Sequence, residues 1–189
     1  MQKHILTIML WLAPVLLQAA EIEGVKLADK VRVADAGPEL MLNGAGVRTR
    51  LVFKVYVGAL YLQQKHNAPE AIFSDGAHKR VALHLLRDVS AEQLFSALND
   101  GLKSNHTSDQ LAKLEAQTRE FEAIFKKLQS VKAGDVILLD FTPGAGTRVT
   151  VNGAAKGVVA GDEFYTALLR IWLGEKPAED SLKKALLGG

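Results

Sequence analysis

Apolar and polar residues alternate along several stretches of this chain, and in others apolar residues recur every three or four positions. Alternation is typical of half-buried strands, and the longer spacing is typical of helices that pack on one face. Strands are predicted within 21–33 and at 39–42, 51–62, 79–88, 136–139, 147–151 and 154–159. Helices are predicted within 63–75 and at 90–102, 107–128, 164–173 and 177–187. This order predicts an α+β fold in which helices cover one face of an antiparallel sheet.

Three local signals support these boundaries. Ser90 and Gln93 form a capping box, in which a hydroxyl residue precedes the helix and Gln follows three residues later. Thr107 and Gln110 repeat the pattern before the next helix. Asn152-Gly153 lies between two strand-like segments and is a strong signal for a type I′ hairpin turn.

The segment from Leu42 to Leu62 organises the rest of the chain. It begins with Asn43-Gly44-Ala45-Gly46, a turn signal whose glycines permit positive φ or the close approach of a backbone or ligand. Arg48 and Arg50 follow, and then the strand 51–62. On one straight strand Arg48 and Tyr56 would lie about 26 Å apart, at about 3.3 Å per residue. They can act together only if the chain turns near Arg50 or Leu51.

Composition narrows the possible functions. The chain has 189 residues, enough for one domain, and 48% of them are apolar. There are no cysteines, so disulfides and thiolate metal sites are excluded. The formal net charge of +2 gives no argument for nucleic acid or an anionic membrane as a partner.

Residues 1–20 have the pattern of a secretory signal peptide. Lys3 and His4 precede an apolar segment from Ile5 to Leu17 that is too short to span a bilayer, and Ala19-Ala20 offers a cleavage site. The alternative is a retained membrane anchor. With the signal removed, we expect one domain, 21–189, soluble in the periplasm of a Gram-negative host and without stable membrane insertion.

Few residues offer chemistry. No two of the five histidines are spaced for metal binding, and the serines lack the context of a nucleophile elbow. We therefore predict no metal and no cofactor. Arg48 and Tyr56 remain: a planar cationic fork and a hydroxyl on an apolar body, which together suit a carboxylate. Lys54 lies two residues from Tyr56 and is predicted on the same face. The alternative is that Arg48 pairs with a surface acid and Tyr56 belongs to the core.

Gly44-Ala45-Gly46-Val47-Arg48, followed by the segment from Lys54 to Leu62, resembles the start of the chalcone isomerase-like family. The resemblance extends over residues 22–187. It implies a long curved antiparallel sheet with a helical layer on one face, an open-faced β-sandwich with a cleft between the layers. It also implies that Arg48 lies at the cleft. At the position of Tyr56 the flavonoid cyclases of the family have threonine, whereas its plant fatty-acid-binding members have a tyrosine that helps the arginine hold the fatty-acid carboxylate.

Three departures from the cyclases bear on function. Their polar cleft residues correspond to Leu94, Gly101 and Ile171 here, which leaves a more apolar cleft. The interpretation is an exported, non-catalytic protein that binds a small apolar ligand such as a fatty acid through Arg48, Tyr56 and Lys54.

Two alternatives stay open. One is an isomerase, an intramolecular lyase on another substrate, with Arg48 stabilising a developing anion. The other is a protein-interaction module with a vestigial cleft. A cleft that reaches Arg48 favours a ligand or a substrate, and one filled by Phe53, Phe95 or Trp172 favours the module.

The signal-peptide hypothesis predicts the N-terminus of the exported protein. Cleavage after Ala19 or Ala20 should leave Ala20 or Glu21 as the first residue, and intact-mass spectrometry of a periplasmic extract measures this directly. Recovery of the full chain from Met1 in the membrane fraction would contradict export.

Overall fold

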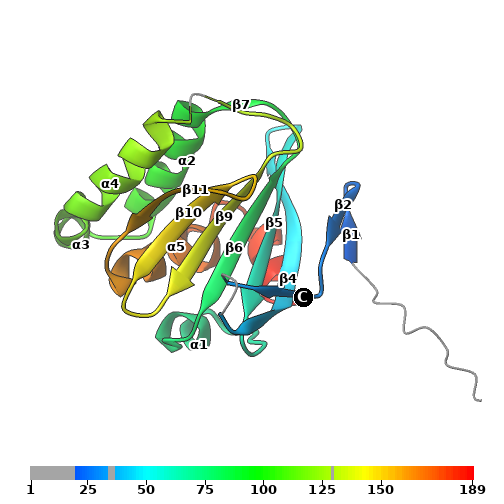
Figure 1. Ribbon diagram of the computed structural model, residues 1–189, viewed down its shortest axis with the longest axis horizontal. Coiled ribbons are helices and arrows are strands. Elements are labelled where there is room, and N and C mark those ends of the chain that lie inside the picture. Colours follow the sequence, from blue (N-terminus) through cyan, green and yellow to red (C-terminus); the bar gives the residue numbers. More distant parts are fainter. Residues whose placement is uncertain (1–19, 34–36, 129) are drawn as a thin grey trace, which may run out of the picture.

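The computed structural model describes residues 20–33, 37–128 and 130–189, so the predicted signal segment lies outside the described residues apart from Ala20 (Figure 1). Its centre is a seven-stranded antiparallel sheet in the order β11-β10-β9-β6-β5-β4-β3. The strands are β3 (Lys30–Arg32), β4 (Glu39–Arg50), β5 (Phe53–Leu62), β6 (Lys79–Leu85), β9 (Val136–Thr142), β10 (Gly146–Val151) and β11 (Ala154–Val159). Two short pairs flank it: β1 (Ala20–Ile22) with β2 (Val25–Leu27), and β7 (Val89–Ser90) with β8 (Ser130–Val131).

Helices cover one face of this sheet, as the pattern predicts (Figure 1). They are α1 (Pro69–Ser74), α2 (Ala91–Ser104), α3 (Ser108–Lys113), α4 (Glu115–Lys126), α5 (Asp162–Leu173) and α6 (Asp180–Leu186). The main core lies between sheet and helices, where Leu60 and Leu83 meet Phe121 and Trp172. A smaller cluster on the other face includes Val57, which packs with residues of the β1–β4 segment. The α+β prediction is therefore confirmed.

The local signals are also confirmed. Both capping boxes form, with Ser90 accepting from the Gln93 backbone and Thr107 from that of Gln110. Asn152 and Gly153 have φ of 50° and 79°, the two positive values that a type I′ turn requires. The helix predicted at 107–128 is instead two helices, because Leu114 leaves the helical region with φ −97° and ψ 3°. The break buries Leu114, whereas α3 buries no residue.

The turn predicted at Asn43–Gly46 is wrong, because these residues lie inside β4. The glycines instead permit the close approach of another backbone, the second possibility raised by the sequence. A Cβ on Gly44 would lie 2.1 Å from the Ala185 carbonyl oxygen, and one on Gly46 would lie 2.7 Å from the Ala185 Cβ. Helix α6 therefore packs directly on β4. The chain turns later, at Leu51-Val52, and β5 begins at Phe53.

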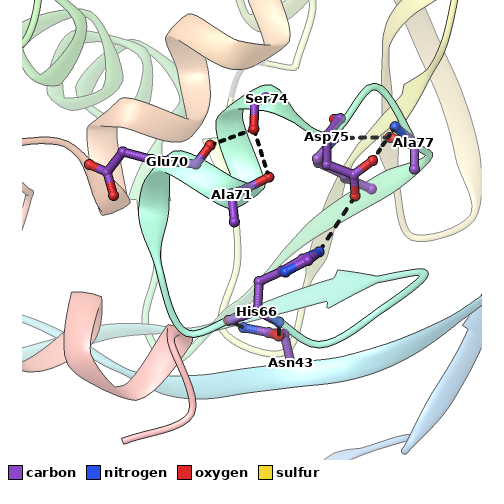
Figure 2. Close-up of polar contacts among 8 residues, drawn as sticks. Asn43, His66, Glu70, Ala71, Ser74, Asp75 and Ala77 are labelled. Atoms are coloured by element: carbon purple, nitrogen blue, oxygen red, sulfur yellow. Dashed lines mark hydrogen bonds and ion pairs between the residues drawn. The ribbon is translucent and has the colours of Figure 1, made fainter.

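Asn43 fastens the far end of α6. Its side-chain nitrogen donates to the carbonyl oxygens of Leu186 at 2.7 Å and His66 at 2.9 Å, and its oxygen accepts from the His66 backbone N–H at 2.8 Å. Figure 2 shows Asn43 beside His66, whose ring points toward Asp75 with 3.9 Å between Nε2 and Oδ2. A buried amide that is satisfied in this way joins β4, the loop after β5 and the end of α6 into one unit.

The contact between Gly44 and α6 leads to a test by substitution. We expect Gly44→Ala to lower the free energy of unfolding by about 1–3 kcal/mol, because the new methyl group meets the rigid backbone of Ala185 and Leu186. Chemical denaturation measures the change. Gly76→Ala is the control, since a Cβ there has nothing within 4 Å, and it should leave stability close to that of wild type. Equal stability of the two variants would contradict close docking of α6.

Candidate ligand-binding site

The Leu51-Val52 turn brings Arg48 opposite Tyr56. Strands β4 and β5 pair antiparallel, and Arg48 and Tyr56 are direct partners in the register. Directly opposed residues of antiparallel strands have Cα atoms roughly 5 Å apart. The prediction that the chain must turn near Arg50 or Leu51 if these residues are to meet is confirmed.

A β-bulge separates Lys54 from this pair. Arg48 pairs with Tyr56 but Thr49 pairs with Lys54, so Val55 is an extra residue on β5. Val55 and Tyr56 consequently both face the cavity described below, and Lys54 turns to the other face of the sheet. There its Nζ binds Glu23 Oε1 at 2.7 Å, beside β1 and β2. The prediction that Lys54 shares the face of Tyr56 is wrong, because the bulge inverts the alternation.

A cavity of about 280 Å³ lies between this end of the sheet and α2. Its floor is buried and mostly apolar, formed by Tyr56, Leu94, Leu98 and Ile171. Its exposed rim comes from the β4–β5 turn, the loop after β6 and the first turns of α2, namely Arg50, Leu51, Phe53, Arg87, Asp88, Gln93 and Ala97. Arg48, Val55, Val89 and Ala178 complete the wall.

The aromatic residues that would indicate a vestigial cleft do not fill this cavity. Phe95 packs on the other side of α2, with its ring centroid 6.2 Å from those of Phe121 and Phe125. Phe53 lies at the rim, 54% exposed. Leu94 and Ile171 line the floor. Gly101 does not line it but leaves space for Ile171, because a Cβ added at Gly101 would lie 2.7 Å from Ile171 Cγ2.

Trp172 orients Tyr56 from behind. Its indole N–H donates to the Tyr56 hydroxyl oxygen at 2.9 Å. Burial raises the pKa of Tyr56, and the hydrogen bond from Trp172 and the charge of Arg48 offset only part of this effect. The phenol therefore stays neutral and keeps its proton. Within the described part of the chain the Tyr56 hydroxyl donates to no protein acceptor, so its proton is available to a ligand.

Glu179 holds Arg48 in place. Its Oε2 lies 3.2 Å from Arg48 Nη1 and accepts from the Thr49 backbone N–H at 2.6 Å, while its Oε1 accepts from Ser181 Oγ at 2.7 Å. Partial burial raises the pKa of Glu179, but the hydrogen bonds from Thr49, Ser181 and Arg48 outweigh it, so the net pKa lies below the ordinary value.

Arg48 retains donors for another anion. Nη1 also donates to the Thr49 carbonyl oxygen, whereas Nε and Nη2 donate to no protein acceptor among the described residues. Sequence reasoning anticipated that an acid could complete Arg48 but did not identify Glu179 or the Trp172 contact. The described residues hold no cluster of three or more His, Asp or Glu side chains that could bind a metal.

Comparison with known proteins places this geometry in a family. The family model described as chalcone isomerase-like matches residues 19–188. The chain belongs to the chalcone isomerase-like family. No curated protein sequence matches it. Among solved structures, a fatty-acid binding protein of Arabidopsis thaliana aligns with a TM-score of 0.60 and 16% identity, over 84% of this chain and 95% of that chain. At this identity the likeness shows the shared fold of the family.

The contacts of Glu179 predict a pH-dependent contribution to stability. Glu179→Gln should lower the free energy of unfolding by about 1–2 kcal/mol at neutral pH, because charge-assisted hydrogen bonds to Arg48 and Thr49 are weakened at a partly exposed site. The folded-state pKa of Glu179 is below the ordinary 4.5, so the unfolded state takes up protons first as pH falls. The extra stability of wild type over Glu179→Gln is therefore fully present above about pH 4.5 and is lost as pH falls through the lower folded-state pKa.

Urea unfolding of both proteins across the acid range measures this difference. Glu175→Gln is the control, since Glu175 is exposed and makes no ion pair among the described residues. A difference between Glu179→Gln and wild type that stays constant through the acid range would show that the carboxylate does not hold the site together.

Proposed function

We propose that this protein binds a fatty acid in the cavity, with the carboxylate on Arg48 and Tyr56 and the alkyl chain along the apolar floor. The observation that carries the proposal is the direct pairing of Arg48 with Tyr56 in the wall of a cavity whose floor includes Leu94, Leu98 and Ile171. The aligned plant protein is a fatty-acid binding protein, which supports the same class of ligand.

The protein offers suitable hydrogen-bond donors to the ligand's carboxylate. Arg48 Nε and Nη2 and the Tyr56 hydroxyl can each donate to a carboxylate, and charge-assisted hydrogen bonds are the stronger kind. Glu179 is the negatively charged partner of Arg48. A ligand carboxylate either displaces Glu179 or binds beside it, and in both cases Glu179 opposes binding. Lys54 is not part of the proposed site, because it faces the other side of the sheet.

The floor favours binding over cyclase chemistry. Cyclisation of a chalcone requires preorganised donors for the charge that develops on the ketone oxygen, and Leu94 and Ile171 provide none. Tyr56 keeps its proton and is therefore a donor and not a base. The volume of about 280 Å³ lies just below the usual range of small-ligand sites, about 300–1,000 Å³. Decanoic acid, a medium-chain fatty acid, is the appropriate probe.

Calorimetry with decanoate tests this proposal through three substitutions. Arg48→Ala should weaken binding about 10- to 150-fold, since a charge-assisted hydrogen bond contributes about 1.5–3 kcal/mol. Tyr56→Phe should weaken binding about 2- to 12-fold, as it removes a neutral donor. Glu179→Gln should tighten binding, because the competing negative charge is removed.

The controls separate the head group from the chain. Methyl decanoate keeps only a neutral carbonyl acceptor, so Arg48→Ala should weaken its binding far less than that of decanoate, and Glu179→Gln should leave it nearly unchanged. Arg148→Ala is the matched arginine control, since Arg148 is exposed on β10 and does not line the cavity; Arg50 is unsuitable because it lies at the rim. Circular dichroism checks folding, above all for Tyr56→Phe, which leaves the buried Trp172 N–H without its acceptor. Equal affinities for acid and ester, or changes of the same sign in Arg48→Ala and Glu179→Gln, would contradict the proposed site.

A further inference from the structure

The β4–β5 turn exposes three large apolar side chains in a row. Leu51 is 90% exposed, Val52 83% and Phe53 54%. Figure 1 shows this turn at the same end of the molecule as β7 and the start of α2, and Leu51 and Phe53 belong to the cavity rim. Contiguous exposed apolar residues mark interaction sites more often than isolated ones do. We call Leu51, Val52 and Phe53 the apolar tip.

The requirements of the turn do not explain these residues. Leu51 has a φ of 57°, a left-handed conformation that Gly and Asn adopt far more readily than leucine. The β10–β11 hairpin of the same protein has Asn152-Gly153 at its turn. The β4–β5 turn instead has a bulky apolar residue in a strained conformation with its side chain in solvent. Neither hydrogen bonding nor packing among the described residues requires leucine here, so its apolar side chain is free to contact another surface.

The charges around the tip indicate the nature of that partner. Within the described part of the chain Arg50 and Arg87 form no ion pair, and the Arg87 guanidinium lies 4.6 Å from the Phe53 ring centroid. The acids near them are already neutralised: Asp88 by Lys132, Glu179 by Arg48 and Glu23 by Lys54. Although the net charge of the chain is small, the rim of the cavity is locally basic.

We propose that the apolar tip, with Arg50 and Arg87, docks on an anionic phospholipid surface. The apolar side chains enter the interface while the arginines meet lipid phosphates, the combination that gives stable peripheral binding. A second copy of the chain fits less well, since a stable protein interface covers roughly 800 Å² on each partner and the tip has three residues. In the described residues no helix is long and apolar enough to cross a membrane.

Docking in this orientation brings the cavity rim to the lipid. A fatty acid could then pass between the bilayer and the floor at Leu94 and Leu98 without crossing water. The docking surface rests on the apolar tip with Arg50 and Arg87 and does not depend on the ligand. Its use in ligand exchange rests on the proposed function.

Flotation of the protein with vesicles, in the absence of fatty acid, tests the docking surface. We expect binding to vesicles of phosphatidylcholine mixed with phosphatidylglycerol and much weaker binding to phosphatidylcholine alone. Val52→Asp should reduce partitioning at least about tenfold, because an apolar side chain that enters the lipid interface is replaced by a negative charge. Val158→Asp is the matched control: Val158 is 51% exposed on β11, at the opposite edge of the sheet, and its substitution should have no effect.

The basic residues and the turn are tested in the same way. Arg50→Gln and Arg87→Gln should each lower binding to the anionic vesicles about fivefold, whereas Arg148→Gln should not. Leu51→Asn should lower vesicle binding while keeping or raising thermal stability, because asparagine tolerates the left-handed backbone. A loss of vesicle binding in this variant is therefore not a consequence of unfolding.

Two outcomes would overturn docking. In the first, the wild-type protein binds equally to vesicles with and without phosphatidylglycerol. In the second, the tip variants bind the anionic vesicles as well as the control variants do. Decanoate calorimetry in solution keeps this result separate from the proposed function. Val52 does not line the cavity, so Val52→Asp should lose its binding to vesicles and keep its affinity for decanoate. If wild type binds vesicles but not decanoate, the proposed function fails and docking stands.

Discussion

The close contact between α6 and β4 determines the arrangement of the candidate site. Gly44 and Gly46 lack the side chains that would hold the helix away, so α6 lies directly on the strand. One end of the helix is fastened by Asn43, and at the other end Glu179 reaches Arg48 and the backbone of Thr49. The glycines themselves do not line the cavity, yet they let α6 approach closely enough for Glu179, the residue before the helix, to pair with Arg48.

The polar groups of the site are held in place before any ligand arrives. A cation beside an apolar cavity would be costly without a partner, and Glu179 is that partner for Arg48. Trp172 similarly occupies the acceptor of Tyr56 and leaves its proton free. Under the proposed function, a ligand carboxylate replaces Glu179 on Arg48 or binds beside it. The same groups would distinguish a charged head group from a neutral one under that proposal.

Local chemistry could be predicted from the sequence, and distant contacts could not. The capping boxes at Ser90 and Thr107 and the turn at Asn152-Gly153 depend on neighbouring residues, and the structure has them as expected. The Leu51-Val52 turn carries no turn signal, since neither leucine nor valine is a residue that tight turns favour. The bulge at Val55 is set by how β4 and β5 pair, and it moved Lys54 to the other face. Glu179 lies 131 residues from Arg48, and no local pattern links them.

A crystal structure with 10-bromodecanoic acid tests the central claim most directly, because anomalous scattering locates the bromine independently of the protein. The account predicts the carboxylate within hydrogen-bond distance of the Arg48 guanidinium and the Tyr56 hydroxyl, and the bromine along the floor near Leu94, Leu98 and Ile171. A bromine beside Arg48, or a ligand bound away from this cavity, would contradict the account.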